Sequence, residues 1–157
     1  MSSPVDRVRA ALTSCGLDVQ IAEFDQSTAT SQQAADALGV PVATIVKSLV
    51  FLVNDRPVLV LASGANRVDL DKLARIAGGK AKRADAERVK AETGFAIGGV
   101  PAVGHSAPLA TFIDQDLMAY PQLWAAAGSP YAVFPVTPQE LVRISGGVVV
   151  ELKQQGE

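Results

Sequence analysis

Two residue types on which many active sites depend are almost absent from this chain. Its 157 residues include one cysteine, Cys15, and one histidine, His105. A single cysteine excludes an internal disulfide, and these two residues leave only carboxylates as further metal ligands, so we expect no metal site. A Walker loop, a GxSxG elbow and a GxGxxG motif between a strand and a helix are also missing. The commonest signatures of nucleotide binding and of serine hydrolases are therefore excluded.

The sequence also lacks the long apolar runs of membrane proteins. Its longest apolar runs are far shorter than a membrane span. The N-terminal stretch MSSPVDRVRAAL carries charges throughout and no apolar core, so it does not read as a signal peptide. A single cysteine agrees with a reducing compartment. We expect a cytoplasmic protein that does not contact a membrane.

Charge is modest in amount but uneven in distribution. The net charge is −2, which argues against bulk nucleic-acid binding. Residues 67–90 hold eight cations and four anions, a local charge of +4 that leaves −6 for the rest of the chain. The cations are Arg67, Lys72, Arg75, Lys80, Lys82, Arg83, Arg88 and Lys90. A local basic patch can steer a phosphate-bearing partner, although a solvated helical face of mixed charge has the same composition.

Helix caps, glycine stops and apolar periodicity predict interleaved helices and strands within one domain, residues 1–157. Helices are predicted between the cap and stop pairs Ser3 and Gly16, Thr30 and Gly39, Asp69 and Gly78, Asp85 and Gly94, and Thr137 and Gly146, with shorter helices at 41–45 and 121–127. Strands are predicted at 19–24, 45–53, 58–62, 109–113, 131–136 and 148–152, and turns at 54–57 and 114–116. The expected fold class is α/β (α+β), with a mixed, mostly antiparallel central sheet flanked by helices.

A glycine-rich loop, FAIGGVPAVGH at 95–105, stands between two apolar runs. Gly98, Gly99 and Gly104 can adopt backbone conformations that other residues avoid, and they let a ligand approach the main-chain N–H groups. Pro101 stiffens the loop without adding a donor. Such a loop can form a cradle of amide donors for an anion or a developing oxyanion. Glycine and proline also build ordinary tight turns, and the spacing alone favours that reading.

One lysine interrupts the apolar hairpin predicted at 45–62. Lys47 lies near the start of the strand IVKSLVFLV, where a buried ammonium needs an anion or a water-filled cleft. A lysine at the strand edge with its ammonium in solvent is the structural alternative. His105 is the single histidine, so a Ser–His–Asp triad has little support. The set of a lone lysine, an amide cradle and a basic patch suits an anionic ligand or an ester whose carbonyl is polarised by backbone donors.

Four segments resemble one known family when taken together and in order. They are IVKSLVF at 45–51, SGANRVDLDKLA at 63–74, TGFAIGGVPAVGH at 93–105 and FIDQDL at 112–117. These segments are similar to those of the YbaK / prolyl-tRNA-synthetase-associated editing-domain family, over the chain from about Thr28 to the C-terminal strand. The resemblance implies a YbaK-like fold. It also implies a free-standing deacylase that hydrolyses the ester of mischarged tRNA without a metal or organic cofactor.

The resemblance also implies roles for particular residues. The family's strand lysine falls on Lys47, which would hold the terminal phosphate or the acyl carbonyl. Its glycine loop falls on Gly98, Gly99 and Gly104, and the N–H groups of Gly98, Gly99 and Val100 would bind the oxyanion. Expected substrate contacts and pocket walls are Val46, Leu61, Phe95, Ile97, Val100, Pro101, Gly104, His105, Phe112, Gly128 and Ser129. His105 matches a position that varies among relatives, and many relatives have proline where this chain has Ala102.

The implied substrate is a small amino acid (alanine, cysteine, serine or similar) esterified to the proline tRNA. The turn Gly128-Ser129-Pro130 lacks the basic residue that cysteine-specific relatives often carry, which weakens an assignment to cysteine. The 67–90 patch would meet tRNA phosphates, and an aminoacyl-tRNA synthetase is a second candidate partner. The alternative function is a non-catalytic module that binds tRNA 3′ ends or a synthetase through the same groove.

Overall fold

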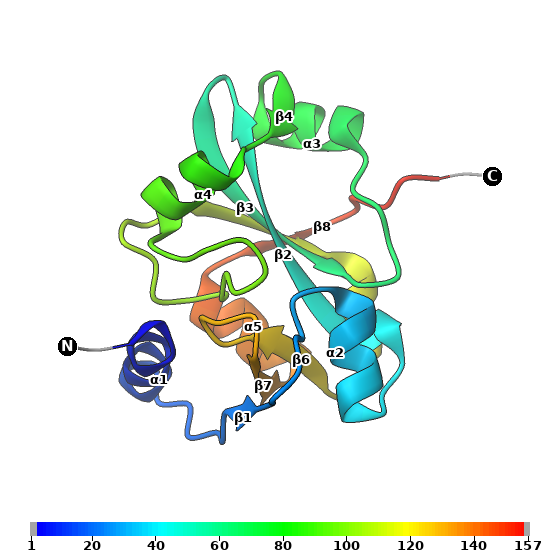
Figure 1. Cartoon of the computed structure of the whole chain (residues 1–157). Coiled ribbons are helices and arrows are strands. Elements are labelled where there is room, and N and C mark those ends of the chain that lie inside the picture. The colour runs from blue at the N-terminus through cyan, green and yellow to red at the C-terminus, as the bar shows by residue number, and fades with distance from the viewer. Residues whose placement is uncertain (1–2, 156–157) are drawn as a thin grey trace.

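A long twisted hairpin of two strands, β2 (Ile45–Val53) and β3 (Arg56–Ser63), runs through the middle of the molecule (Figure 1). It is seen in a computed structural model that describes residues 3–155. Asn54 and Asp55 join the strands with φ angles of 51° and 67°, the left-handed conformation that a two-residue hairpin turn requires. The turn is therefore shorter than the predicted 54–57, and Arg56 and Pro57 belong to β3.

The other elements surround this hairpin. The remaining strands are β1 (Ala22–Glu23), β4 (Ala81–Arg83), β5 (Ala110–Asp114), β6 (Leu123–Ala126), β7 (Ala132–Val136) and β8 (Val148–Val150). The α-helices are α1 (Pro4–Ser14), α2 (Ser31–Leu38), α3 (Leu70–Ala77), α4 (Ala86–Thr93) and α5 (Pro138–Ser145), and the 3₁₀ helices are η1 (Val42–Thr44) and η2 (Gln115–Ala119). No helix within residues 3–155 is long and apolar enough to cross a membrane.

The sheet is mixed, as predicted. Its strand order is β1-β7-β6-β2-β3-β5-β8, with β4 paired to β2 outside this path. Four of the pairings are antiparallel and three are parallel. The parallel pairs are β2–β6, β3–β5 and β5–β8. The predicted fold class is thus confirmed.

Local hydrogen bonds at the helix ends explain why the five helices predicted between a cap and a glycine stop are found. Ser3, Thr30 and Thr137 each form a capping box with the residue three positions on. Helices α2, α3, α4 and α5 each end on a glycine in the left-handed conformation. These signals lie within a few residues of one another, so the sequence alone carries them.

The predicted short helix at 121–127 is wrong, because this segment contains strand β6. β6 pairs in parallel with the start of β2 and antiparallel with β7. Its residues alternate between buried and half-buried, with Leu123 and Ala125 inside. That alternation is the period of a strand, and pairing with two neighbours overrides the weak helical preference of two alanines.

Three further elements differ from the predictions. The strand predicted at 19–24 is reduced to Ala22–Glu23, because β7 pairs only with these two residues. The turn predicted at 114–116 continues into η2, whose N-cap is Asp114. β4 was not predicted, since a basic three-residue segment carries no apolar pattern and is a strand only through its pairing with β2.

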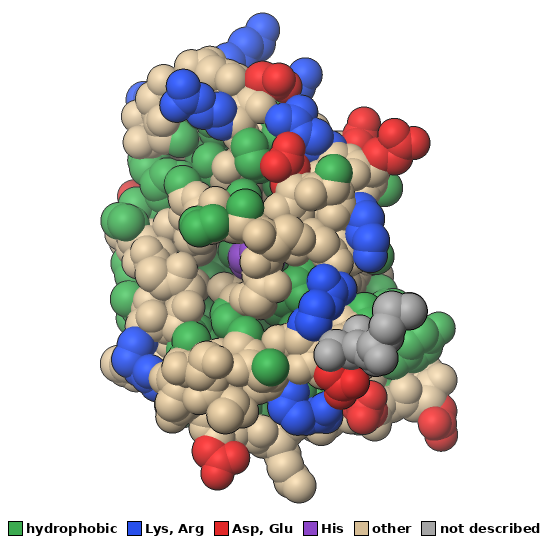
Figure 2. Space-filling model, turned by 90° about the vertical axis from the view of Figure 1, so that its left-hand side faces the viewer, with side chains coloured by type: hydrophobic (Ala, Val, Ile, Leu, Met, Phe, Trp, Pro, Cys, Tyr) green, Lys and Arg blue, Asp and Glu red, His purple; other side chains and the backbone are tan. Residues whose placement is uncertain are grey.

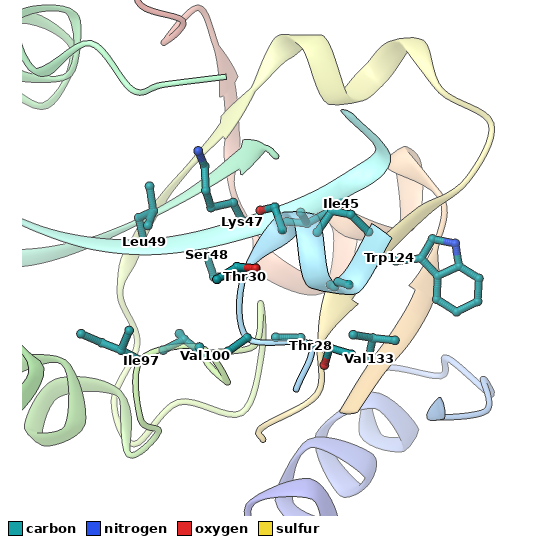
Figure 3. Close-up of a pocket in the computed structure, with 17 residues that line it drawn as sticks. Thr28, Thr30, Ile45, Lys47, Ser48, Leu49, Ile97, Val100, Trp124 and Val133 are labelled. Atoms are coloured by element: carbon teal, nitrogen blue, oxygen red, sulfur yellow. The ribbon is translucent and has the colours of Figure 1, made fainter. Parts of the chain in front are cut away.

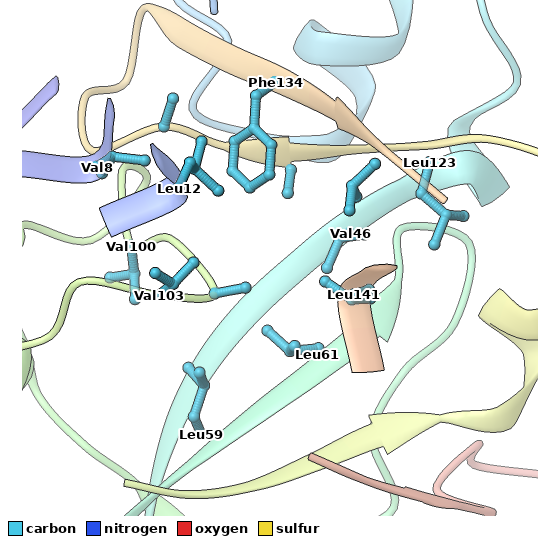
Figure 4. Packing of buried hydrophobic residues seen from close by; sticks show 14 of the residues in the cluster. Val8, Leu12, Val46, Leu59, Leu61, Val100, Val103, Leu123, Phe134 and Leu141 are labelled. Atoms are coloured by element: carbon cyan, nitrogen blue, oxygen red, sulfur yellow. The ribbon is translucent and has the colours of Figure 1, made fainter. Parts of the chain in front are cut away.

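Apolar side chains fill both faces of the sheet. The larger cluster packs α1, α4, α5 and the 95–105 loop against one face, with Phe134, Leu61 and Leu141 fully buried (Figure 4). A smaller cluster joins α3 to the opposite face of the hairpin through Leu73 and Phe51. A third cluster seats α2 against Ile45 and Trp124. The hairpin is therefore held from both sides, and Lys47 lies on it near the start of β2.

Candidate active site

A gap in the sheet exposes one edge of β2. On this edge β6 pairs only with Ile45 and Val46, and β4 pairs only with residues 51–53. Residues 47–49 are therefore paired on the β3 side alone. Gly64 N–H donates to the Ile45 carbonyl on the β3 side, and Ala84 N–H donates to the Val50 carbonyl on the other side. Since backbone groups alternate between the two edges, the N–H and C=O of Ser48 face the gap.

A cavity of about 270 Å³ opens at this gap. Its walls come from β2, the segment that leads into α2, the glycine loop, β6 and β7 (Figure 3). The lining residues are Thr28, Ala29, Thr30, Ser31, Ala34, Ile45, Val46, Lys47, Ser48, Leu49, Ile97, Gly98, Val100, Trp124, Ala125, Ala126 and Val133. Most of these side chains are small, and Lys47 is the single charged residue among them. The cavity thus suits a small ligand with a negative or strongly polarised group.

Lys47 is half-buried and points to one side of β2, whereas its neighbour Ser48 points to the other (Figure 3). Lys47 Nζ donates to the backbone carbonyl of Asn66 at 2.5 Å. No carboxylate within residues 3–155 lies at ion-pair distance from this ammonium. An ammonium has three N–H donors, so two stay available to a ligand.

The surroundings of Lys47 make its positive charge costly. Burial lowers the pKa of the Lys47 ammonium, the nearby positive charges of Arg83 and Arg67 lower it further, and the carboxylate of Asp114 opposes these effects. A bound anion would offset both the cost of burying the charged ammonium and its repulsion by the two arginines. The site is therefore electrostatically ready for a phosphate or a developing oxyanion.

The first half of the glycine loop closes the cavity opposite β2. Ile97, Gly98 and Val100 line it. Gly98 has a φ of +91°, and a Cβ there would lie 2.9 Å from Ala29 Cβ. Gly99 N–H donates to the Ala96 carbonyl at 3.0 Å, which closes a turn. For the N–H groups of Gly98 and Val100, no protein acceptor is found within the described part of the chain.

Gly99 lies outside the cavity lining, where it packs the loop against the turn at Gly128 and Ser129. A Cβ at Gly99 would lie 2.9 Å from the Ser129 backbone nitrogen. Gly128 has a φ of +97° and lies close to the Pro4 carbonyl of α1. Neither Gly128 nor Ser129 lines the cavity, so this turn supports the loop from behind.

The second half of the loop turns away from the cavity. His105 Nε2 lies 2.7 Å from the Pro101 carbonyl oxygen, and its ring meets Phe95 edge-on with centroids 6.3 Å apart. Phe95 is fully buried, and the Arg7 guanidinium lies 4.7 Å above its ring. Only a small part of His105 reaches the surface (Figure 2). Burial lowers the pKa of the His105 imidazole, and the hydrogen bond with Pro101 opposes this shift.

Several residues predicted as substrate contacts or walls therefore do not line the cavity. Phe95, Pro101 and Leu61 are buried, Phe112 packs against the cluster on the α3 side, and Gly104 and His105 lie toward α1. By contrast, Val46, Lys47, Ile97, Gly98 and Val100 are brought together. Apolar residues near a loop look alike in sequence whether they face a cavity or the core, which is why the two sets were not separated.

The residues that sequence reasoning missed come from the entry to α2 and from the β6–β7 pair. Thr28, Ala29 and Thr30 read as an ordinary helix start, and Trp124 was assigned to a helix. The capping box at Thr30 locates the start of α2 but says nothing about what lies opposite it. Ser48 was also missed, although its Oγ is buried and has no hydrogen-bond partner within residues 3–155.

A second, basic cavity of about 390 Å³ shares Lys47 with the first. Arg67 and Arg83 contribute its other charges, and Leu49, Phe51, Val68 and Leu70 form its apolar walls. Two other cations of the 67–90 patch are engaged elsewhere. Lys72 pairs with Glu151, and Arg88 pairs with Asp55 and Glu92. Of the eight cations, Arg67 and Arg83 are the two that line the cavity beside Lys47.

Comparison with known proteins places these features in a family. The family model described as the aminoacyl-tRNA editing domain matches residues 25–144, which include β2, every residue that lines the first cavity and the whole glycine loop. The chain belongs to the aminoacyl-tRNA editing domain family. The resemblance of the four sequence segments is thereby confirmed.

Individual relatives agree with this assignment. The Bacillus subtilis (strain 168) protein YwhH is 32% identical over 139 residues, covering 88% of both chains. An Enterococcus faecalis (strain ATCC 700802 / V583) protein named "Putative Cys-tRNA(Pro)/Cys-tRNA(Cys) deacylase EbsC" is 25% identical over 125 residues, covering 78% of this chain and 76% of that protein. A crystal structure described as "a putative trans-editing enzyme for prolyl tRNA synthetase" is 46% identical, covers 99% of both chains and superimposes with a TM-score of 0.93.

Within the described part of this editing domain, no group of three or more histidine, cysteine, aspartate or glutamate side chains could hold a metal ion. The groups available at the cavity are a lysine ammonium, backbone donors and the hydroxyls of Thr28, Thr30, Ser31 and Ser48.

Proposed function

We propose that this editing domain is a trans-acting hydrolase that cleaves the ester of mischarged aminoacyl-tRNA. The observation that carries the proposal is the Lys47 ammonium, which has no carboxylate partner within residues 3–155 and lies beside a small cavity closed by the glycine loop. A structural lysine would be paired or fully solvated. This one is half-buried among other cations, which an anionic or polarised ligand would stabilise.

In the proposed reaction, the aminoacyl ester occupies the gap in the sheet. Lys47 holds the terminal phosphate or the acyl carbonyl with its two remaining N–H donors. The N–H groups of Gly98 and Val100 bind the oxyanion of the tetrahedral intermediate, each contributing roughly 3–4 kcal/mol by analogy with other hydrolases. Gly99 was expected to act as a donor as well. Because its N–H already bonds Ala96, we assign it the role of letting the loop pack closely against Ser129.

Among the described residues, no histidine or carboxylate lines the cavity to act as a base. We propose that the free ribose hydroxyl of the terminal adenosine or the loop backbone orients the attacking water. The water oxygen adds to the ester carbonyl, the bond from the carbonyl carbon to the ribose oxygen breaks, and a proton from the water passes to that oxygen, which leaves as the tRNA hydroxyl; no metal is required. His105 is bonded to Pro101 outside the cavity lining, so it has no role in this scheme.

The proposed substrate carries a small amino acid such as alanine, cysteine or serine on the proline tRNA. The side chains of Ala29, Ala34, Ala125 and Ala126 leave a compact cavity whose volume suits such a residue. Clash with these walls would exclude large side chains, whereas one methylene is worth only about 1–3 kcal/mol of discrimination. The names of EbsC and of the prolyl tRNA synthetase trans-editing enzyme agree with this substrate class.

The test is release of amino acid from alanyl-, cysteinyl-, seryl- and prolyl-tRNA, all made on the proline tRNA. We expect rapid release of one small residue with prolyl-tRNA spared. Lys47→Ala should lower the rate by about 100-fold or more, because charge stabilisation of this kind is worth that much elsewhere. Arg9→Ala, an exposed cation of α1 outside the 67–90 patch and both cavities, is the control and should change the rate less than about threefold.

Near-normal activity in a folded Lys47→Ala protein would contradict the role of Lys47. If no substrate is hydrolysed but tRNA still binds, the non-catalytic module that binds tRNA ends or a synthetase becomes the better description.

The two arginines beside Lys47 are proposed to meet tRNA phosphates. Arg83→Ala should weaken tRNA binding and reduce the slope of log affinity against log salt by about one. Arg88→Ala serves as the control, because its guanidinium is already paired with Asp55 and Glu92. Equal effects of the two substitutions, measured by titrating tRNA at several salt concentrations, would contradict a specific role for Arg83.

A further inference from the structure

Two sequence segments that the proposed reaction does not use meet behind Lys47. SGANR at 63–67 follows β3, and FIDQD at 112–116 crosses the end of β5. β3 and β5 are parallel, with Leu61 opposite Ile113, so both segments leave the sheet at the carboxyl ends of these strands, on the same side of the molecule. Asp114 lies at their junction and is 1% exposed.

The carboxylate of Asp114 receives all of its hydrogen bonds from these two segments. Its Oδ2 accepts from the Ser63 N–H at 3.1 Å and from Asn66 Nδ2 at 2.8 Å. Its Oδ1 accepts from the Asp116 N–H at 3.0 Å. A buried carboxylate with three such hydrogen bonds holds its partners firmly, because losing one would leave a charge without compensation.

Asn66 links this carboxylate to the candidate site. Its Nδ2 also donates to Asp116 Oδ2 at 2.9 Å, so one amide nitrogen bridges two carboxylates with its two hydrogens. The Asn66 N–H donates to the Ser63 carbonyl. With its side chain and N–H both engaged, Asn66 has its carbonyl left to accept the Lys47 ammonium.

We propose that Asp114 and Asn66 are positioning residues for Lys47, which act by fixing the carbonyl that orients its ammonium. The four-carbon stem of a lysine is flexible, and Arg67 and Arg83 repel its charge. Without the Asn66 carbonyl, the Lys47 ammonium would have no hydrogen-bond acceptor found within residues 3–155, and only the more distant charge of Asp114 would oppose that repulsion. The catalytic consequence rests on the proposed function, whereas the orienting contact does not.

Three charged groups face Lys47, each from a different part of the fold. Arg83 comes from β4, Arg67 from the loop after β3, and Asp114 from the end of β5. Burial is the largest effect that lowers the pKa of Lys47, the two arginines lower it further, and Asp114 raises it. Removing the Asp114 charge should therefore lower the pKa of Lys47. Asn66→Ala removes no charge, so a lowered pKa of Lys47 in that variant would report loss of the orienting carbonyl itself.

The experiment compares Asp114→Asn with Asp116→Asn in the full chain. Lysine labelled with ¹³C at Cε reports the pKa of Lys47 by NMR, and Lys47→Arg identifies its signal. In Asp114→Asn we expect a lower pKa of Lys47 and a loss of kcat/KM on the order of tenfold to 100-fold, as for a displaced catalytic group. Asp116→Asn keeps an oxygen acceptor for Asn66 and should lose less than about threefold.

Asn66→Ala keeps the carbonyl but frees the loop, and it provides the test if Asp114→Asn does not fold. It should lower kcat/KM by about tenfold or more. Folded variants that retain both the pKa of Lys47 and full activity would overturn the inference. If the wild-type protein hydrolyses no aminoacyl-tRNA, the proposed function fails. The positioning role is then decided by NMR alone in Asn66→Ala, which removes no charge: a lowered pKa of Lys47 supports the orienting contact and an unchanged one overturns it.

Discussion

The two halves of the glycine loop differ in what they face. Ile97, Gly98 and Val100 line the cavity, whereas Gly104 and His105 pack toward α1. Gly98 and Gly104 nevertheless have nearly the same φ angle, +91° and +88°, in the region that favours glycine. Gly98 therefore allows the loop to approach a ligand cavity closely, whereas Gly104 allows the loop to pack against helix α1. A glycine-rich composition cannot tell these two needs apart.

Substitution of the two glycines should separate them, and it gives the largest expected effect. Gly98→Ala and Gly104→Ala each place a Cβ in the left-handed region and should each lose about 1–2 kcal/mol of unfolding free energy. At Gly98 the new Cβ also meets Ala29 Cβ at 2.9 Å, which would move the loop N–H groups. We expect Gly98→Ala to lower deacylation by about 100-fold.

Gly104→Ala is the matched control, since its nearest neighbour, Ala11 Cβ, would be 3.4 Å away. Its deacylation rate should fall less than about threefold, because no catalytic donor moves. Urea unfolding and single-turnover deacylation measure the two effects separately. An equal loss of activity in both variants would show that the whole loop acts as one unit.

His105→Ala should affect stability more than activity. The substitution removes the hydrogen bond with the Pro101 carbonyl and the edge-on contact with Phe95. A loss of about 1–3 kcal/mol in unfolding free energy is expected, because a buried acceptor is left unsatisfied. Deacylation should fall less than about tenfold, which is milder than for Lys47→Ala. A greater loss of activity than in Lys47→Ala would reverse this ranking and assign His105 to the chemistry.

The smallest expected effect is a pH dependence of stability. Burial lowers the pKa of His105 in the folded protein below its usual value of about 6.5. Between these two pKa values the unfolded chain binds more protons than the folded chain, so the contribution of His105 to stability is lost as pH falls below about 6.5. His105→Gln should flatten this part of the profile, measured by urea unfolding at about pH 7.5 and about pH 5. A profile as steep as that of the wild type would contradict the assignment to His105.

Much of the local structure could be predicted from residues close together in sequence. The capping boxes at Ser3, Thr30 and Thr137, the glycine helix ends and the apolar hairpin are all found in the structure. β6 could not be predicted, because LWAA becomes a strand only when β2 and β7 lie beside it. The same limit applied at the candidate site, where Lys47 and Gly98 could be singled out by residue type but Ser48 and Trp124 could not.

The sequence by itself determined the helix ends, the hairpin with the single lysine on its first strand, and the glycine-rich loop at 95–105. These features depend on caps, turns and steric limits, which act over a few residues. Only the tertiary structure decided that β6 and β4 leave a gap beside Ser48, and that Asp114 and Asn66 meet behind Lys47. Those features depend on strand pairing and burial between residues far apart in the chain. Their energy comes from contacts that no short window of sequence contains.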